Sequence, residues 1–196
     1  MKIYSQNQEQ PAILAACPAT GHYLEIGAWN AFDKSNVRAL YERGWSGVSV
    51  EPSPVPFAGL LEVYRDEPRV SLINAAVVLD TTAGAISMYV TADAVSTADP
   101  ATYAKWKNYA KYDGEVLVPA TSLEQIYSDH GPFDFVSIDS EGTSAELLYR
   151  LLELGKCPKC ICVEHDERTT EILSKVTPMG YACIYVSGEN LVLVKQ

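Results

Sequence analysis

The sequence predicts an α/β fold in which a mostly parallel sheet of about seven strands carries helices on both faces. Apolar strand patterns alternate with helical patterns in the order β-α-β-α-β from His22 to Val78. This order is typical of a parallel sheet with right-handed crossovers. The last two strand patterns, 181–186 and 191–195, are joined by a Ser-Gly-Glu-Asn turn. That turn indicates a C-terminal antiparallel hairpin.

The N-terminal half supplies the first strands and helices of this Rossmann-like arrangement. Residues 1–20 form a leading segment that is mostly polar. Strand patterns cover 22–26, 47–50 and 70–78, and a further one at 84–90 is expected at an edge of the sheet. Helical patterns cover 33–43, where Asp33 is the expected N-cap, and 54–65.

The C-terminal half continues the alternation after the irregular segment 91–114. Strand patterns cover 115–118, 133–138 and 160–163. Helical patterns cover 121–129, 143–154 and 167–176. A length of 196 residues suits one sizeable core. We therefore expect residues 1–196 to form a single domain.

Composition excludes several classes of function. The chain has 15 basic and 25 acidic residues and a formal net charge of -10, without a basic run, so nucleic acid is not an expected partner. No apolar run reaches the roughly 18 residues of a membrane helix, and residues 1–10 do not resemble a secretory signal. The five cysteines do not form a disulfide framework. We expect a cytoplasmic protein that does not bind membranes.

The first strand and its turn form a candidate ligand cradle. Glu25 lies near the end of this strand, and Gly27 and Ala28 follow. In open α/β sheets, ligands bind outside the carboxyl ends of the strands. A dinucleotide needs G-x-G-x-x-G, but Trp29 stands where the second glycine should be. A carboxylate suits a cationic ligand such as S-adenosylmethionine better, because it can accept a hydrogen bond from the ammonium group.

The next two strand ends offer groups for a nucleoside. Glu51 closes the second strand and Pro52 follows it. In nucleotide-binding folds an acid at this place accepts hydrogen bonds from both ribose hydroxyls; the alternative is an exposed loop acid. Asn74, Ala75 and Ala76 end the third strand, where an adenine edge would lie. The alternative for these three residues is a strand that continues through them.

Candidate catalytic groups follow the two strands after the irregular segment. Asp139 and Glu141 come after a buried strand, and like charges in one cleft can raise a pKa enough for a general base. Asp139 could instead orient the substrate. His165 ends the next strand and is a further candidate base, because histidine is the side chain that exchanges protons most readily near neutral pH. A histidine at the rim of a loop is an equally good interpretation.

We assign no metal from the sequence. Cys157, Cys160, Cys162 and His165 invite a zinc interpretation. Cys160 and Cys162 alternate with apolar residues, however, as small core residues of a strand would. A divalent cation bound by Asp139, Glu164 and His165 is conceivable, because oxygen ligands gather there, but it is not favoured.

The irregular segment 91–114 carries an aromatic stripe. Tyr103, Trp106, Tyr109 and Tyr112 recur every third residue and are interleaved with lysines. On a helix beginning at Pro100 this stripe could cover the cleft as a lid, with the lysines meeting an anionic substrate. The alternative is a helix packed on the edge of the sheet. We favour substrate recognition slightly.

These motifs resemble the FkbM-type class I methyltransferases. The resemblance rests on four motifs in the expected order between about Tyr23 and His165. They are Leu24-Glu25-Ile26-Gly27-Ala28, Glu51-Pro52-Ser53-Pro54, Asn74-Ala75-Ala76, and the segment Asp134 to Gly142. The Ile-Asp-Ser-Glu-Gly end of the last motif is the most specific. Trp29 and Ala31 depart from the family pattern, which normally has Asn and Gly there.

The resemblance implies a class I methyltransferase fold, S-adenosylmethionine as cofactor and, usually, O-methylation of a hydroxyl on a sugar or other small molecule. It implies that Glu25, Gly27 and Ala28 hold the methionine end and that Glu51 holds the ribose. Asn74 to Ala76 would surround the adenine, and Asp139 and Glu141 would face the reacting centre.

We therefore predict a methyltransferase that uses S-adenosylmethionine and acts on a small-molecule acceptor, with a carbohydrate as one candidate. Two other functions remain open at this point. A nicotinamide-dependent oxidoreductase would use the same fold, although its glycines are missing. A non-catalytic binding module would result if Trp29 filled the pocket.

Overall fold

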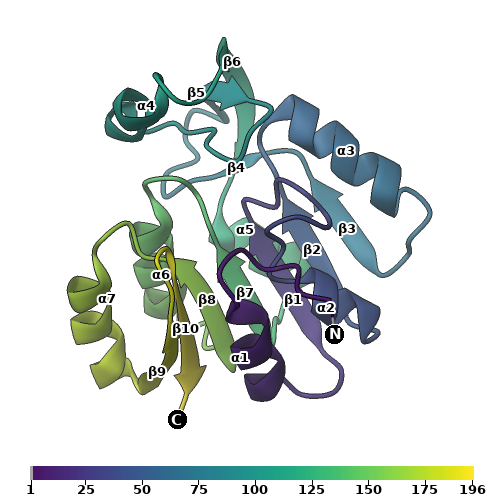
Figure 1. Ribbon diagram of the computed structural model, residues 1–196, viewed down its shortest axis with the longest axis vertical. Coiled ribbons are helices and arrows are strands. Elements are labelled where there is room, and N and C mark those ends of the chain that lie inside the picture. Colours follow the sequence, from purple (N-terminus) through teal and green to yellow (C-terminus); the bar gives the residue numbers. More distant parts are fainter. Residues whose placement is uncertain (1) are drawn as a thin grey trace.

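The computed structural model describes residues 2–196 and contains a seven-stranded sheet (Figure 1). Its strands are β1 (His22–Ile26), β2 (Ser46–Val50), β3 (Val70–Ile73), β7 (Phe135–Ile138), β8 (Cys160–Glu164), β9 (Tyr181–Val186) and β10 (Asn190–Lys195). The strand order is β3-β2-β1-β7-β8-β10-β9. The pairs from β3 through β8 are parallel, and β10 is antiparallel to both of its neighbours. The predicted fold class, with its C-terminal hairpin, is confirmed.

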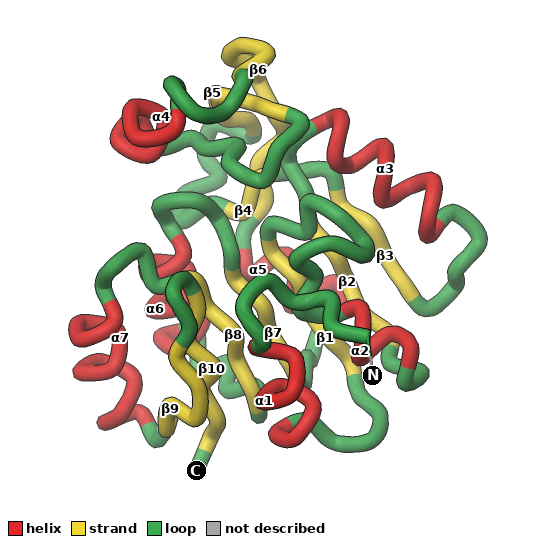
Figure 2. Tube along the Cα trace, viewed as in Figure 1, coloured by secondary structure: helices red, strands yellow, loops and turns green. Residues whose placement is uncertain are grey.

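Helices cover both faces of this sheet (Figure 2). They are α1 (Glu9–Ala16), α2 (Arg38–Glu42), α3 (Pro54–Tyr64), α5 (Leu123–His130), α6 (Ser144–Glu153) and α7 (Thr169–Val176). Among the described residues, no helix combines the length and apolar character that a bilayer crossing requires.

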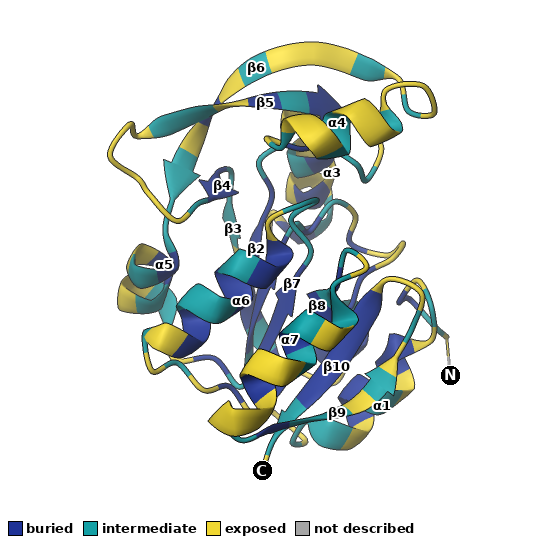
Figure 3. Ribbon diagram, turned by 90° about the vertical axis from the view of Figure 1, so that its left-hand side faces the viewer, coloured by how far each residue is buried: buried dark blue, intermediate teal, exposed yellow. Residues whose placement is uncertain are grey.

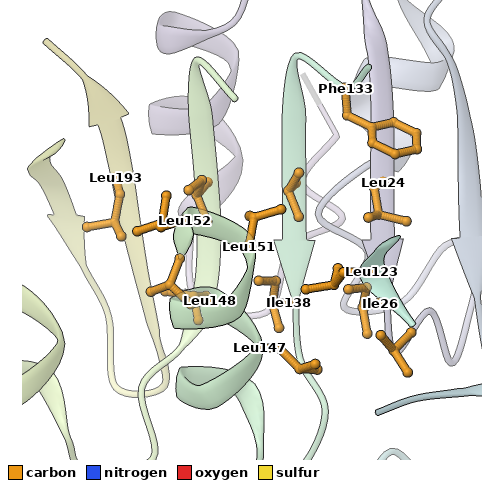
Figure 4. Close-up of a cluster of buried hydrophobic side chains, with 14 of the residues drawn as sticks. Leu24, Ile26, Leu123, Phe133, Ile138, Leu147, Leu148, Leu151, Leu152 and Leu193 are labelled. Atoms are coloured by element: carbon orange, nitrogen blue, oxygen red, sulfur yellow. The ribbon is translucent and has the colours of Figure 1, made fainter. Parts of the chain in front are cut away.

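The larger core lies between the sheet and α5, α6 and α7. Residues at alternate positions of the strands, such as Leu24 and Ile26 of β1, point to this side and are fully or almost fully buried. Leu147, Leu148 and Leu151 of α6 meet them (Figure 4). Burial of each such side chain contributes about 1.5–3 kcal/mol before entropy is counted. This packing fixes the register of the parallel strands, and hence where they end.

The opposite face packs on α1 and α2. Tyr23 and Phe135, one residue out of phase with the first set, are buried there with Ile13 of α1. Cys160 and Cys162 belong to the same cluster and are fully buried, whereas Cys157 is exposed. Cys160 and Cys162 therefore occupy core positions of β8, as small apolar residues do.

A second, three-stranded sheet stands over the carboxyl ends of the parallel strands (Figures 1 and 3). Its order is β4-β6-β5, and its strands are β4 (Ala76–Val77), β5 (Ala85–Thr91) and β6 (Tyr112–Thr121). Met88, Val90 and Val118 form its small core. The predicted strand at 84–90 therefore belongs to this sheet and not to an edge of the main one.

The predicted strand at 70–78 is divided at Asn74. Its amide Nδ2 donates hydrogen bonds to the carbonyl oxygens of Glu51 and Pro52, at 2.8 and 3.1 Å. These bonds tie the chain to the end of β2 and direct the following residues out of the main sheet. Ala76 and Val77 then pair with Ala120 and Thr121 of β6.

Helix α2 begins at Arg38, later than the predicted start at Asp33. The preceding residues form a loop in which Asn30 Oδ1 accepts hydrogen bonds from the amides of Phe32 and Asp33. Lys34 has a φ of 56°, which interrupts any helix there. Ser35 Oγ, and not the side chain of Asp33, accepts the bond from the Arg38 amide.

The predicted aromatic helix is also shorter than expected. Helix α4 (Pro100–Trp106) ends before Tyr109 and Tyr112, and none of its residues is buried. Tyr103 stacks on Tyr89 of β5 with ring centroids 3.9 Å apart and meets Tyr112 edge to face. Tyr103 therefore attaches α4 to the small sheet, whereas Tyr109 is exposed.

The turn after β1 packs on the end of β7 so closely that only glycine fits. Gly27 has a φ of 78°, and a Cβ there would lie 1.7 Å from the carbonyl oxygen of Asp139. Gly44 also has a positive φ, of 94°, but a Cβ there would meet nothing within 4 Å. A comparison of substitutions at Gly27 and Gly44 therefore separates the cost of the left-handed backbone from the cost of the contact with Asp139.

We predict that Gly44→Ala lowers the free energy of unfolding by about 1–2 kcal/mol, the cost of a left-handed L-residue. Gly27→Ala should lower it by more than about 4 kcal/mol, because the Asp139 backbone must also move. Urea unfolding of both variants measures the difference. Equal losses would show that the β1 turn and the end of β7 do not constrain each other.

Candidate functional site

The carboxyl ends of the parallel strands open into one cavity of about 540 Å³. It lies where the strand order reverses, between β1 and β7, and the small sheet and α4 stand over it (Figure 1). Its volume is in the range of small-molecule and cofactor sites. The ends of β1, β2, β7 and β8 all contribute residues to its wall.

The turn after β1 forms part of the cavity floor. Gly27 and Ala28 both line the cavity, and their amides donate hydrogen bonds of 3.0 and 3.1 Å to the carbonyl oxygen of Val50. The turn is therefore held against the end of β2 as well as against β7. Both residues lie where the sequence predicts a part of the cofactor site.

Glu51 lies at the end of β2 with 4% of its surface exposed. Its Oε2 accepts a 2.9 Å hydrogen bond from the Trp29 amide, and its Oε1 accepts a 2.7 Å bond from the Ser53 amide. Burial raises the pKa of Glu51, and these amides act against the rise. A carboxylate has about four lone-pair positions. Glu51 therefore keeps acceptor capacity for a ligand, and both it and Pro52 line the cavity.

The expected adenine region is an apolar wall. Ala75 and Ala76 line the cavity, together with Val77, Ile86 and Met88. The residues that line the cavity, within the described chain, do not include Asn74. Its side chain is bonded to the carbonyls of Glu51 and Pro52, as described above. Asn74 is thus placed to shape this end of the cavity through the backbone of its neighbours.

Glu25 does not reach the cavity wall in the described part of the chain. It precedes the last residue of β1, and the alternation of a strand turns its side chain to the α2 side. There it accepts hydrogen bonds from the hydroxyls of Ser49 and Ser35, at 2.8 and 3.3 Å. Burial raises the pKa of Glu25 to about 8, although both hydroxyls oppose the rise. Through its hydrogen bond with Ser35, the Glu25 carboxyl group holds the loop between β1 and α2.

Three carboxyl groups meet where β7 and β8 end. Asp139, Glu141 and Glu164 each offer an oxygen, and these oxygens lie within 4.8 Å of one another. Burial raises the pKa of all three groups, and their mutual repulsion raises it further. The pKa of Glu141 reaches about 8. These groups can therefore accept a proton at neutral pH when one of them is ionised.

The same three carboxylates have a spacing at which a divalent cation can be bound. Within residues 2–196, Asp139, Glu141 and Glu164 are the one group of acidic, histidine or cysteine side chains with this spacing. It differs from both metal sets considered from the sequence, because it contains neither a cysteine nor His165. Exposed acidic groups often gather without an ion, so the spacing alone does not assign a metal.

His165 is 8% exposed and both of its ring nitrogens are engaged. The Glu167 amide donates to Nδ1 at 3.1 Å, which leaves the proton on Nε2. Nε2 lies 3.3 Å from the carbonyl oxygen of Ser187 and can donate to it. The ring thus joins the loop after β8 to the hairpin turn. It would have to break one of these contacts to act as a base.

Several residues of the cavity had no role in the sequence prediction. They include Gln6, Asp166, Gly188 and Glu189, whereas Asp93 to Ser96 belong to the segment 91–114 that was expected to act as a lid or in substrate recognition. Glu189 could have been placed, because β10 runs antiparallel to β8 and so begins where β8 ends. Gln6 carries no such signal, because the path of the leading segment over the cavity is not encoded in a local pattern.

Of the lysines in segment 91–114, Lys105 lines the cavity together with Trp106. Lys105 and Lys34 lower the pKa of Glu141 slightly against its net rise. Within the described chain, the cavity-lining residues do not include Lys107 or Lys111. The cavity is therefore more acidic than the lid hypothesis assumed, and the positive charge of Lys105 lowers the pKa of two carboxyl groups of the protein itself, Glu141 and Asp166, against their net rise.

Comparison with known protein families assigns the chain to a family. The model of the methyltransferase FkbM domain matches residues 25–181, which is most of the chain. The protein belongs to the FkbM methyltransferase family. Its methyl donor is accordingly S-adenosylmethionine, and a nicotinamide-dependent oxidoreductase is set aside. The search of curated proteins gave no significant match.

Solved methyltransferase structures share the fold of this FkbM methyltransferase. Precorrin-6y C5,15-methyltransferase from Geobacter metallireducens is 12% identical, with a TM-score of 0.52 over 100% of this chain and 92% of that one. A dimethyladenosine transferase from Plasmodium falciparum is 10% identical, with a TM-score of 0.52 over 100% of this chain and 64% of that one. At these identities the likeness shows the fold alone.

A pH series tests the burial of Glu141. The folded protein binds this proton more tightly than the unfolded chain does. The stabilising contribution is therefore complete below a pH of about 4.5 and is lost as the pH rises toward about 8. Glutamine does not titrate. We expect Glu141→Gln to gain stability relative to the wild type, on the order of 2 kcal/mol, between about pH 5 and about pH 8.

Urea unfolding at the two pH values measures this gain. Glu62→Gln, at an exposed position of α3, is the matched control and should follow the wild type at both. If the free energy of unfolding of Glu141→Gln and that of the wild type changed equally between the two pH values, burial would not raise the pKa of Glu141.

Proposed function

We propose that this FkbM methyltransferase transfers the methyl group to a hydroxyl oxygen of a small molecule, with a carbohydrate as the favoured acceptor class. The observation that carries this proposal is the group of Asp139, Glu141 and Glu164 beside Glu51 in one cavity. A hydroxyl must lose its proton as its oxygen attacks, so it benefits from a nearby carboxylate base. An amine attacks through a free lone pair and needs such a base less.

The cavity residues fit S-adenosylmethionine on physical grounds. Glu51 keeps lone pairs for a vicinal diol, Ala76 and Val77 offer an apolar wall for a base, and the acidic end suits a cation. When bound, the cofactor supplies a methyl group on a positively charged sulfur. We assign Gly27, Ala28, Glu51, Pro52, Ala75 and Ala76 to its immediate surroundings. Glu25 and Asn74 act on these surroundings through hydrogen bonds.

The protein's own contribution to the reaction is position and proton transfer. The acceptor must hold its oxygen in line with the methyl group, and such orientation supplies a large part of the rate. We assign Asp139 and Glu141 as the groups that orient the hydroxyl and take its proton. His165 holds the loop that follows Glu164 against the hairpin turn. Trp29 and Trp106 offer aromatic faces in the same cavity for an acceptor ring.

Small acceptors fit this site better than nucleic acid does. The cavity is lined by carboxylates, and the whole chain carries a net charge of -10. A phosphate backbone would be repelled by such a surface. A neutral polyol meets the carboxylates as hydrogen-bond acceptors without that penalty.

The direct test is a methylation assay with S-adenosylmethionine and a panel of sugars, matched amines and phosphorylated sugars. Formation of S-adenosylhomocysteine and the mass and NMR spectrum of the product identify the acceptor atom. The assay includes arms with EDTA and with Mg²⁺, because the three carboxylates have a suitable spacing for a cation. Methylation of nitrogen or carbon alone would contradict the proposal.

We predict that Glu51→Ala weakens S-adenosylhomocysteine binding by more than about tenfold, because hydrogen bonds to a charged group are worth about 1.5–3 kcal/mol. Isothermal titration calorimetry measures the affinity. Glu62→Ala removes an exposed acid of α3 and should leave it unchanged. Unchanged affinity in Glu51→Ala would remove Glu51 from the ribose site.

We predict that Asp139→Asn lowers kcat by about 100-fold or more, the usual effect of a lost acid–base group. The Kd for S-adenosylhomocysteine should change by less than about threefold, because asparagine keeps the shape and a carbonyl acceptor. Glu167→Gln removes an exposed carboxylate at the same cavity and serves as the control. If Asp139→Asn retained full kcat, the proton acceptor would have to be sought elsewhere in the cavity.

A further inference from the structure

The segment between β5 and α4 forms a roof over the cavity. We call residues 92–98 the strap. Asp93, Ala94, Val95, Ser96 and Ala98 of the strap all line the cavity. The strap leaves β5 after Thr91 and returns beside it, because Thr97 and Tyr89 exchange backbone hydrogen bonds of 2.9 and 3.0 Å. It is therefore a closed loop that faces the cavity along most of its length.

One end of the strap is fixed to the catalytic side of the cavity. Thr97 is fully buried, and its Oγ1 donates a 2.7 Å hydrogen bond to the carbonyl oxygen of Glu141. The start of α4 packs close by, since a Cβ on Gly142 would lie 2.6 Å from Thr102 Oγ1. This end of the strap thus moves with the loop that carries Glu141.

The other end is fixed by Trp29. The indole Nε1 donates a 3.0 Å hydrogen bond to the carbonyl oxygen of Ala92. The amide of the same residue donates to Glu51 Oε2 at 2.9 Å. Trp29 therefore connects the carboxylate that we assign to the ribose with the strap that covers the cavity.

The backbone at Trp29 indicates that this connection is imposed by its surroundings. Its φ is 37°, in the left-handed region that non-glycine residues seldom occupy, and asparagine is the side chain that tolerates it best. A tryptophan gains nothing locally from this conformation. In this conformation the backbone amide of Trp29 donates to Glu51 while its ring N–H donates to the carbonyl oxygen of Ala92.

We infer that Trp29 is a positioning residue that holds the strap closed over the nucleoside end of the bound cofactor and so slows its release. The inference rests on the proposed placement of the cofactor at Glu51. Release requires the strap to lift, and the indole bond to Ala92 must open for that to happen. Trp29 acts on the strap and on Glu51, and it takes no part in proton transfer.

Two substitutions at Trp29 separate cofactor retention from folding. Trp29→Phe keeps a ring and removes the N–H group. Trp29→Asn removes the reach to Ala92 but suits the backbone conformation better. We expect both to raise the Kd for S-adenosylhomocysteine by about three- to tenfold, the effect of losing one hydrogen bond. The rise should come from faster dissociation, with association changed by less than about twofold.

Stopped-flow dissociation and calorimetry with S-adenosylhomocysteine provide the readout, and the midpoint of thermal unfolding, Tm, is recorded for each variant. Trp29→Asn should match or exceed the Tm of the wild type, because asparagine suits the left-handed backbone. A residue with only a packing role would instead lower Tm and leave the dissociation rate unchanged. That second result would overturn the inference.

Tyr109→Phe and Thr97→Val complete the experiment. Tyr109 follows α4, is 84% exposed and, within the described residues, does not line the cavity, so Tyr109→Phe should release the cofactor at the wild-type rate. Thr97→Val removes the other anchor of the strap and should accelerate release as Trp29→Phe does. If Thr97→Val leaves the rate unchanged, the strap is not what retains the cofactor, and the inference fails.

The wild type separates this inference from the proposed function. If the wild type does not bind S-adenosylhomocysteine, or if Glu51→Ala binds it equally well, the cofactor placement is at fault. If the wild type binds it and Glu51→Ala does not, but Trp29→Phe releases it at the wild-type rate, the placement stands and the role of Trp29 falls.

Discussion

The contact between the turn after β1 and the end of β7 is the constraint on which the site depends. The peptide of Gly27 approaches the carbonyl of Asp139 so closely that a Cβ has no room. The same turn donates two hydrogen bonds to Val50 at the end of β2. Three strand ends are thereby fixed at one point, where the strand order reverses. Without this contact, Glu51 and Asp139 would not face the same cavity.

The fold accepts an energetic cost at this point. Glu25, Glu51, Asp139, Glu141 and Glu164 are carboxyl groups whose pKa is raised by burial. Their desolvation disfavours the charged form and so works against stability at neutral pH. Serine hydroxyls and backbone amides offset part of this cost at Glu25 and Glu51. The apolar packing of the α6 leucines against the strands offsets the rest of this cost.

Strand positions followed from the sequence because their apolar alternation is local. The prediction of β1, β2, β7, β8 and the hairpin needed only this pattern, and it placed Glu51 and Asp139 at strand ends. The small sheet did not follow, because the bonds from Asn74 to Glu51 and Pro52 that divide the third strand join residues more than 20 positions apart. Glu25 was placed at the strand tip, but the strand alternation turns it to the other face.

The same limit applies to His165 and Trp29. The sequence shows a histidine after a strand, but the donors and acceptors that engage its ring come from Glu167 and from the distant Ser187. Trp29 is visible only as a bulky residue in a glycine-poor turn. Its bond to Ala92 depends on the path of a segment 63 positions later. Local patterns therefore predicted which acids lie near the site, whereas the roles of these residues depend on long-range contacts.

The central claim is that the acids at neighbouring strand ends surround one cofactor in the cavity between β1 and β7. A crystal structure with S-adenosylhomocysteine tests it most directly. We expect the ribose hydroxyls within hydrogen-bond distance of Glu51, the adenine against Ala76 and Val77, and the sulfur facing Asp139. Density for the ligand at any other place on the molecule, or with the adenine at Asp139, would contradict it.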